Sequence, residues 1–183
     1  SYSARDHWER GLVRYDLEDR SMEDLIRDDA IYRNWSISKD SNTIVFSRSD
    51  GDRPDELWVA DGSMVDLRQL TDLNPQLDGV QLTQSELVEY LDVDGEKLYG
   101  ILYYPIDYDP GKKYPLVAEI YETFFDNGYN ANMNLLASRG WFGFRPSVDL
   151  EIGYPGEAWL KGVTTAINKV IDRGMVDHNK LGV

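Results

Sequence analysis

The residues that could carry acid–base or nucleophilic chemistry are few in this sequence. It contains no cysteine and only two histidines, His7 and His178. The lack of cysteine excludes a thiolate nucleophile, a cysteine-based zinc site and a disulfide framework. No serine has a glycine two positions before it and another two positions after it, so the Gly-x-Ser-x-Gly nucleophile elbow is absent from these 183 residues. There is also no glycine-rich phosphate-binding loop.

The acidic residues give no sign of a metal site. The pairs Asp28-Asp29 and Asp6/Glu9 lack metal-site spacing and partner ligands. We interpret them as solvated carboxylates, and we interpret both histidines as surface residues. The sequence therefore predicts no metal and no cofactor.

The net charge of the chain limits the kinds of molecule that it is expected to bind. The chain carries 33 acidic and 19 basic residues, a net charge of −14. A general nucleic-acid binder needs a basic face, which this balance argues against. No apolar run approaches the roughly 20 residues that span a bilayer. We therefore expect a soluble globular protein with no membrane span, either cytoplasmic or secreted to the periplasm or beyond.

The second half of the chain alternates strands and helices. Residues 114–122 read as a short, mostly apolar strand entered through Tyr114-Pro115. A helix over residues 132–139 stops at Gly140, a buried strand covers residues 141–144, and a further strand begins at residue 180. This order predicts an α/β sheet.

The clearest helix covers residues 157–173. Its apolar residues recur at helical spacing on one face, which we expect to pack against the sheet. They are Leu160, Val163, Ile167, Val170 and Ile171. Pro155-Gly156 begins this helix and Gly174 ends it.

The first eighty or so residues have a different character. Short β-type runs at residues 12–17, 32–37, 43–47 and 57–60 lie between turn-forming clusters. A repeat is visible, because Leu12 and Leu57, like Leu25 and Leu70, are 45 positions apart. Periods of roughly 40–45 residues with short strands indicate β-propeller blades, although a meandering β-sandwich would give similar strands.

A connection and a hairpin separate the two halves. Residues 72–85 contain Pro75, Gly79 and many polar residues, as an inter-domain connection does. After it, strands over residues 86–93 and 97–104 flank Asp94-Gly95, a two-residue hairpin signal.

Together these motifs resemble the prolyl oligopeptidase family of serine peptidases, in particular its dipeptidyl-peptidase and acylaminoacyl-peptidase branches. The runs that carry the resemblance are LRQLTDLNPQL, DGEKLYGILYYP, KKYPLVAEIYE, GYPGEAW and VIDRGMVDHNKLGV. It covers roughly residues 40–183. In that family a β-propeller precedes an α/β-hydrolase domain, and the segment equivalent to KLGV leads into the nucleophile elbow.

The resemblance implies two candidate site residues. Tyr121 matches a tyrosine that serves the dipeptidyl-peptidase branch as an oxyanion-hole donor, and a phenol at a strand end has suitable chemistry. Glu122 is a candidate contact for a substrate amine, with a solvated carboxylate as the alternative. Glu122-Thr123-Phe124 departs from the Gly-Pro usual after that tyrosine, and Arg145-Pro146-Ser147 departs from the Arg-Gly-Ser often found after the next strand.

The resemblance also implies the fold and the domains. We expect a mixed fold: the C-terminal blade or blades of a β-propeller over residues 1–78, then the start of an α/β-hydrolase sheet over residues 79–183, truncated before the nucleophile elbow. The nucleophile, base and acid would all follow Val183. We therefore expect the chain alone to be inert, and to need the rest of the polypeptide for a closed fold.

The function implied is that of a serine-type peptidase acting on short peptides by Ser-His-Asp acyl transfer. Two alternatives stay open. One is a non-catalytic β-rich binding or assembly module, and the other is an esterase-type α/β-hydrolase. The sequence makes no choice between exopeptidase and endopeptidase, and it sets no side-chain preference, oligomeric state or compartment.

Overall fold

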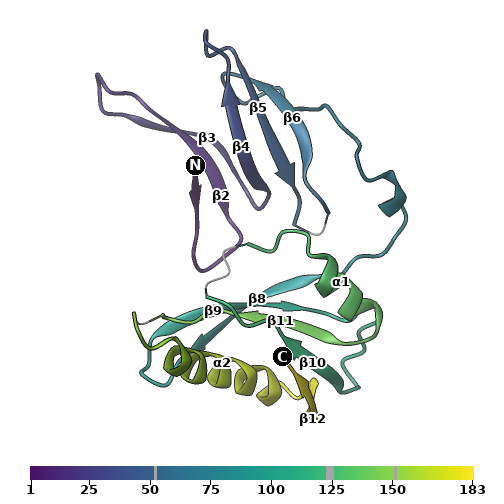
Figure 1. Ribbon diagram of the computed structural model, residues 1–183. Coiled ribbons are helices and arrows are strands. Elements are labelled where there is room, and N and C mark those ends of the chain that lie inside the picture. The colour runs from purple at the N-terminus through teal and green to yellow at the C-terminus, as the bar shows by residue number, and fades with distance from the viewer. Residues whose placement is uncertain (52, 123–125, 151) are drawn as a thin grey trace. The chain divides into compact units, whose positions relative to one another are not determined.

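The computed structural model describes residues 1–51, 53–122, 126–150 and 152–183. The chain divides into two compact units (Figure 1). Unit 1 comprises Ser1–Val80 together with Asp126–Tyr129, and unit 2 contains the remaining residues from Gln81 to Val183. The chain therefore contributes a short piece to unit 1 after most of unit 1 is complete, which the sequence analysis did not anticipate.

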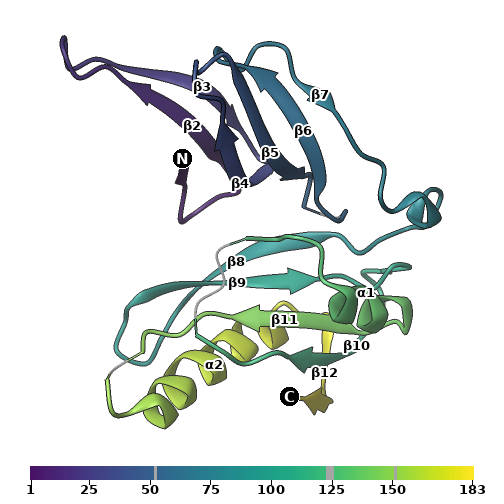
Figure 2. The same cartoon turned by 45° about the horizontal axis from the view of Figure 1, so that its top comes forward.

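Unit 1 consists of two antiparallel sheets in which each strand pairs with the next one along the chain (Figures 1 and 2). The first sheet contains β1 (Tyr2–Ser3), β2 (Arg10–Tyr15) and β3 (Met22–Asp28). The second contains β4 (Ile31–Ile37), β5 (Thr43–Ser49), β6 (Glu56–Asp61) and β7 (Arg68–Gln69). Leu12, Leu25 and Ile26 of the first sheet pack against a buried cluster centred on Phe46 of the second.

The four predicted strands of this unit are confirmed as β2, β4, β5 and β6, with ends shifted by at most two residues. Strand β3 was missed. In its sequence, MEDLIRD, apolar and polar residues do not alternate as they do in a typical half-buried strand. Only Leu25 and Ile26 are partly buried. β3 is an edge of its sheet, and charged side chains suit an edge strand because they discourage pairing with other chains.

The 45-residue repeat falls on matching hairpins. Leu12 lies on β2 and Leu57 on β6. Each is the second-last strand of its sheet in chain order, and each is followed by its antiparallel partner. Leu25 lies on β3, and Leu70 follows β7 directly and donates its amide hydrogen to the Leu57 carbonyl at 2.7 Å. The repeated sequence thus encodes a repeated β-hairpin.

The segment Asp126–Tyr129 is held in unit 1 by charge and by close packing. Arg33 donates one guanidinium nitrogen to Asp126 at 2.7 Å and the other to both carboxylate oxygens of Asp55 at 3.1 Å. Asn127 packs on Gly51, where a Cβ atom would lie 2.6 Å from the Asn127 amide nitrogen. Gly51 also has a φ of +89°, so the position favours glycine twice over.

Unit 2 is built on a five-stranded sheet with the order β12-β10-β11-β9-β8 (Figure 2). Its strands are β8 (Ser85–Leu91), β9 (Lys97–Tyr103), β10 (Tyr114–Ala118), β11 (Phe142–Pro146) and β12 (Val176–Gly182). β10 is parallel to both of its neighbours, whereas β9 runs antiparallel to β11 and β8. The apolar run entered through Pro115 is thus confirmed as an interior strand.

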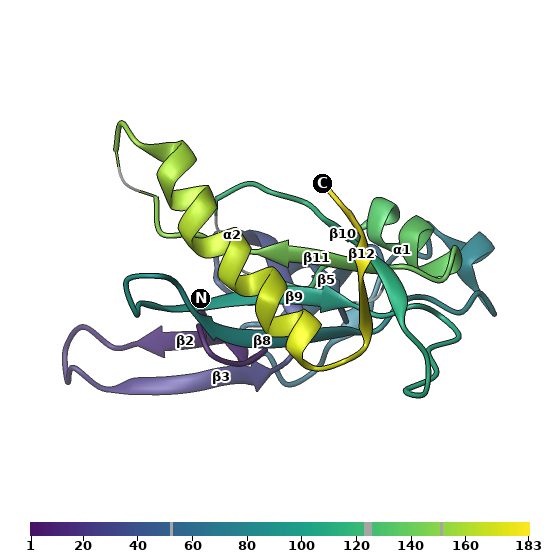
Figure 3. The ribbon, with the colours of Figure 1, turned by 90° about the horizontal axis from the view of Figure 1, so that it is seen from below.

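Helices α1 (Ala131–Ser138) and α2 (Pro155–Asp172) cover opposite faces of this sheet (Figures 1 and 3). Successive residues of a strand point to opposite faces. Accordingly, Phe142 and Phe144 share a buried cluster with Ala166 and Val170 of α2, whereas a Cβ atom at Gly143 would lie 2.3 Å from the sulfur of Met133 on α1. Gly143 therefore allows α1 to approach the sheet.

Both helices were predicted, and one side chain was placed wrongly. Leu160 was expected on the buried face of α2 but is 70% exposed. The buried face is centred instead on small residues, including Ala158, Gly162 and Ala166, which bring α2 close to the strands. On the helix surface Leu160 lies to one side of these small residues, and its side chain is in solvent.

One turn and the start of one strand differ in detail from their predictions. The β8–β9 hairpin has a three-residue loop instead of a two-residue one, because the Asp92 amide bonds to the Glu96 carbonyl and Gly95 adopts a φ of +85°. The final strand, predicted from residue 180, begins at Val176 instead, so His178 lies within β12. There, Tyr114 pairs with Val176 and Leu116 with Leu181, so residues 177–180 form an irregularity in the strand.

A short 3-10 helix, η1 (Pro75–Leu77), lies in the connection between the units. Of the helices in the described part of the chain, none combines the length and hydrophobicity that crossing a lipid bilayer requires.

We expect the Gly143→Ala substitution to destabilise the chain by about 1–3 kcal/mol, because the added methyl group has no room beside the buried Met133. Urea unfolding measures this change in the free energy of unfolding. Gly156→Ala in α2 is the matched control, since a Cβ atom there meets nothing within 4 Å. Combining Gly143→Ala with Met133→Ala should cost less than the two single changes added together. Simple additivity would contradict the packing argument.

A second prediction concerns Arg33 and Asp126. Burial disfavours the Asp126 carboxylate, but hydrogen bonds from Arg33 and the Gly128 amide outweigh burial and lower its pKa. A lowered pKa stabilises the fold above the unfolded-state value and loses that effect as the pH falls below about 4.

A double-mutant cycle with Arg33→Gln and Asp126→Asn should give a coupling energy of about 0.5–1 kcal/mol at neutral pH, since both side chains are partly exposed. The coupling energy should decrease as the pH falls below about 4. The control cycle uses Arg53 and Asp78, which are 3.5 Å apart and more exposed, and should give almost no coupling. Equal coupling in the two pairs would show that Asp126 has no special anchoring role.

Candidate functional site at the carboxyl end of the parallel strands

The parallel strands of unit 2 bring their carboxyl ends to one edge of the sheet. Ligands of open α/β sheets bind outside the carboxyl ends of the strands, so this edge is where a site is expected. Tyr121 and Glu122 follow β10 there. The chain that follows β11 and the end of β12 lie at the same edge, because both strands are parallel to β10.

Tyr121 is held by a hydrogen bond to its backbone, while its side chain is exposed to solvent. Its carbonyl accepts a hydrogen bond from the indole nitrogen of Trp159, on α2, at 2.9 Å. The side chain itself is 62% exposed. No hydrogen bond joins its hydroxyl to any other residue that the structure describes. A phenol presented in this way could donate to a ligand.

Glu122 is also tied down through its backbone. The Val148 amide donates to the Glu122 carbonyl at 2.9 Å. The Glu122 side chain is exposed, and Thr123 and Phe124, at which the sequence departs from the family pattern, lie outside the described residues. The structure therefore brings Tyr121 and Glu122 to the same edge of the sheet, where both side chains are open to solvent.

Val148 is positioned by α2. It is buried, and a Cβ atom at Gly162 would lie 2.9 Å from its Cγ1 atom. Only a residue without a side chain lets the helix approach this closely. Consequently α2 fixes both residues of the candidate site, Tyr121 through Trp159 and Glu122 through Val148.

An ion pair that the sequence analysis did not single out lies at the end of the paired strands. The Glu119 amide donates to the Phe144 carbonyl at 2.8 Å, which extends the β10–β11 pairing, and the Glu119 carboxylate lies 3.3 Å from Arg145. The Arg145 side chain is largely buried. The pair balances its own charge and needs no ligand to do so.

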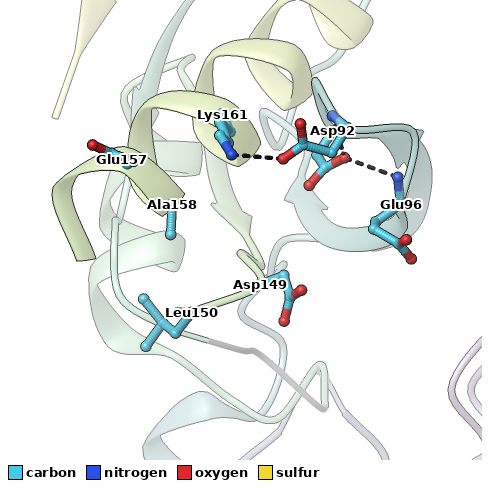
Figure 4. A pocket seen from close by; sticks show the side chains of 8 residues that line it. Asp92, Glu96, Asp149, Leu150, Glu157, Ala158 and Lys161 are labelled. Atoms are coloured by element: carbon cyan, nitrogen blue, oxygen red, sulfur yellow. Dashed lines mark hydrogen bonds and ion pairs between the residues drawn. The ribbon is translucent and has the colours of Figure 1, made fainter. Parts of the chain in front are cut away.

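Unit 2 also contains a small acidic cleft of about 260 Å³ (Figure 4). It lies between the β8–β9 loop, the start of α2 and the segment after Val148. Its lining residues are Asp92, Asp94, Glu96, Asp149, Leu150, Glu157, Ala158 and Lys161.

Much of the charge in this cleft serves the local structure. Lys161 bonds to the Asp94 carboxylate at 2.6 Å, and the Asp92 carboxylate accepts the amide hydrogens of Asp94 and Glu96 at 2.9 and 2.8 Å. These bonds shape the hairpin turn and tie it to α2. Among the residues that the structure describes, no three histidine or acidic side chains are grouped as a metal site would require.

Neither histidine joins the candidate site. His7 is exposed on unit 1, where its ring nitrogen bonds to Asp6 at 2.6 Å. His178 is exposed on β12. Both are surface residues, as predicted, and neither is placed beside Tyr121 by any contact within the described part of the chain.

No protein-family model matches this chain, and no curated protein matches it. Solved structures do. An isopeptidase, AtxE2, with astexin3-dC4 bound superposes with a TM-score of 0.75 at 17% identity, over 97% of this chain and 31% of the isopeptidase chain. The acylaminoacyl peptidase of Pyrococcus horikoshii gives a TM-score of 0.70 at 17% identity, over 94% of this chain and 30% of the other.

The dipeptidyl peptidase 4 of Porphyromonas gingivalis gives a TM-score of 0.71 at 15% identity, over 94% of this chain and 28% of the other. The matched structures are members of the prolyl oligopeptidase family, and this chain spans about 30% of their length. At such low identity the likeness concerns the fold. The chain therefore folds like a stretch of the prolyl oligopeptidase-family peptidases, which confirms for the fold the resemblance carried by its motifs.

Proposed function

We propose that this chain is part of a serine-type peptidase that hydrolyses peptide bonds in short peptides. In this proposal residues 1–78 are β-propeller blades and residues 79–183 are the start of an α/β-hydrolase domain. Tyr121 is the oxyanion-hole donor, and Glu122 is a secondary contact for a substrate amine. The Ser-His-Asp triad is supplied by the remainder of the polypeptide.

The propeller assignment is supported by unit 1. Its second sheet is a four-stranded antiparallel meander, as a propeller blade is, and the 45-residue repeat falls on equivalent hairpins of the two sheets. The first sheet would then be the preceding blade.

One observation carries the proposed chemistry: β12 is the parallel neighbour of β10, so the carboxyl ends of both strands share an edge. In the family, the nucleophile elbow follows the strand equivalent to KLGV. A nucleophile placed directly after β12 would therefore emerge at the edge where the exposed side chain of Tyr121 lies. That is the geometry in which a phenol could stabilise the oxyanion of a tetrahedral intermediate.

The test is labelling of the native polypeptide, as it occurs in its source, with a fluorophosphonate probe, followed by assays with peptide amides and short acyl esters. Labelling together with amide hydrolysis is the expected result. Labelling with ester hydrolysis alone would replace the peptidase by an esterase. A protein of 21.0 kDa that takes up no probe would favour a non-catalytic binding module.

In the labelled enzyme, we expect Tyr121→Phe to lower kcat by roughly 10²–10³-fold with little change in KM, because an oxyanion donor acts mainly in the transition state. Tyr15→Phe is the control, since Tyr15 is a comparably exposed tyrosine on β2 of unit 1. It should leave kcat unchanged. Unaltered kcat in Tyr121→Phe would remove Tyr121 from the mechanism.

A further inference from the structure

A buried tyrosine lies behind the candidate site. Tyr90, on β8, is only 3% exposed and belongs to the cluster between the sheet and α2. Its hydroxyl donates a hydrogen bond to the backbone carbonyl of Ser147, just beyond the end of β11. Burial raises the pKa of Tyr90, so the hydroxyl keeps its proton and remains a donor across the physiological range.

The acceptor of this bond is one residue away from the candidate site. Ser147 precedes Val148, whose amide hydrogen bonds to the Glu122 carbonyl at 2.9 Å. The Ser147 amide in turn donates to the Tyr99 carbonyl at 3.2 Å. The segment after β11 is thus held on one side by β9 and Tyr90, and it holds Glu122 on the other side.

Helix α2 closes the same arrangement. It contacts Val148 at Gly162 and bonds to Tyr121 through Trp159. Tyr90 packs in one cluster with Ala166 and Val170 of that helix. Tyr90, α2 and the segment after β11 therefore form one supporting layer behind Tyr121 and Glu122.

We propose that Tyr90 is a positioning residue, whose hydroxyl fixes the segment after β11 and thereby sets the placement of Tyr121 and Glu122. This inference rests on the proposed function where it concerns catalysis, but its structural part stands on the bonds alone. Tyr90 touches no reacting atom. It acts through the carbonyl of Ser147, the amide of Val148 and the backbone of Glu122.

A matched control exists on the neighbouring strand. Tyr104 directly follows β9, and its hydroxyl donates to Glu86 at 2.6 Å. Because β9 runs antiparallel to β11, Tyr104 lies at the opposite edge of the sheet from Tyr121. Tyr90→Phe and Tyr104→Phe each delete one hydrogen-bonded hydroxyl, and only the first should disturb the candidate site.

Amide and indole NMR spectra of the polypeptide as it occurs in its source, labelled with ¹⁵N, test the structural part. In Tyr90→Phe we expect the Trp159 indole resonance to shift and the Val148 amide to exchange about threefold to tenfold faster. Trp159→Phe identifies the indole signal of Trp159. In Tyr104→Phe both signals should stay unchanged. The same response to both variants, or none to either, would overturn the proposal.

Gly162→Ala gives a second approach that leaves Tyr90 in place. The added methyl group would press on Val148 from the side of α2, so the Trp159 and Val148 signals should move again. Gly156→Ala, in the same helix and with open space around it, should leave them unchanged. If Gly162→Ala leaves the Trp159 and Val148 signals unchanged, displacement of the supporting layer does not alter the candidate site, and the proposal is wrong.

The catalytic part is tested in the active polypeptide. Tyr90→Phe should lower kcat by about threefold to tenfold and raise KM, because it disturbs both Tyr121 and Glu122, whereas Tyr104→Phe should change neither. Equal kcat in Tyr90→Phe and the parent enzyme would refute a role in positioning. If the polypeptide has no hydrolase activity, or Tyr121→Phe has no effect, the proposed function fails while the NMR experiment still decides the role of Tyr90.

Discussion

The parallel pairing of β10 with both β11 and β12 is the constraint on which unit 2 depends. It buries Leu116 and Ala118 in the middle of the sheet and requires a covered surface on each face, which α1 and α2 provide. It also fixes the direction in which these three strands run. Because three strands run the same way, the residues that follow them gather at one edge, and the placement of Tyr121 follows from chain direction before any side chain is considered.

The candidate site is assembled mainly from backbone hydrogen bonds. Trp159 and Val148 both bond to carbonyl groups of the segment after β10, and the small residue Gly162 lets α2 come close enough to support them. The side chains of Tyr121 and Glu122 are exposed. A site held in this way can keep a steady shape while its exposed side chains differ, provided that the glycine and the buried donors behind it remain.

Much of this architecture could be predicted, because periodicity and turn residues are local properties of the chain. Proline at the entry to β10, glycine after both helices and the apolar face of α2 were sufficient to place most elements of unit 2. Leu160 was misplaced because helical spacing marks an apolar face without showing which part of that face the sheet covers. β3 was missed because an edge strand needs little burial and so carries little pattern.

The site itself could be predicted only in part. Family resemblance pointed to Tyr121 and Glu122, but nothing in the sequence linked them to Trp159, Val148 or Tyr90. Those links join residues 26 to 57 positions apart and depend on the register of the sheet. The discontinuity of unit 1 was equally hidden, because the bond between Arg33 and Asp126 spans 93 positions.

That discontinuity has a consequence for the order in which the chain is made. A nascent chain grows from its N-terminus, and its domains generally fold as units during synthesis. Here Arg33 and Asp55 are translated long before Asp126, with β8, β9 and β10 in between. Unit 1 therefore gains the contacts of Asp126 only after β10, an interior strand of unit 2, has been synthesised. Most of unit 1 precedes unit 2 in the sequence, yet the last residues of unit 1 are synthesised while unit 2 is still incomplete.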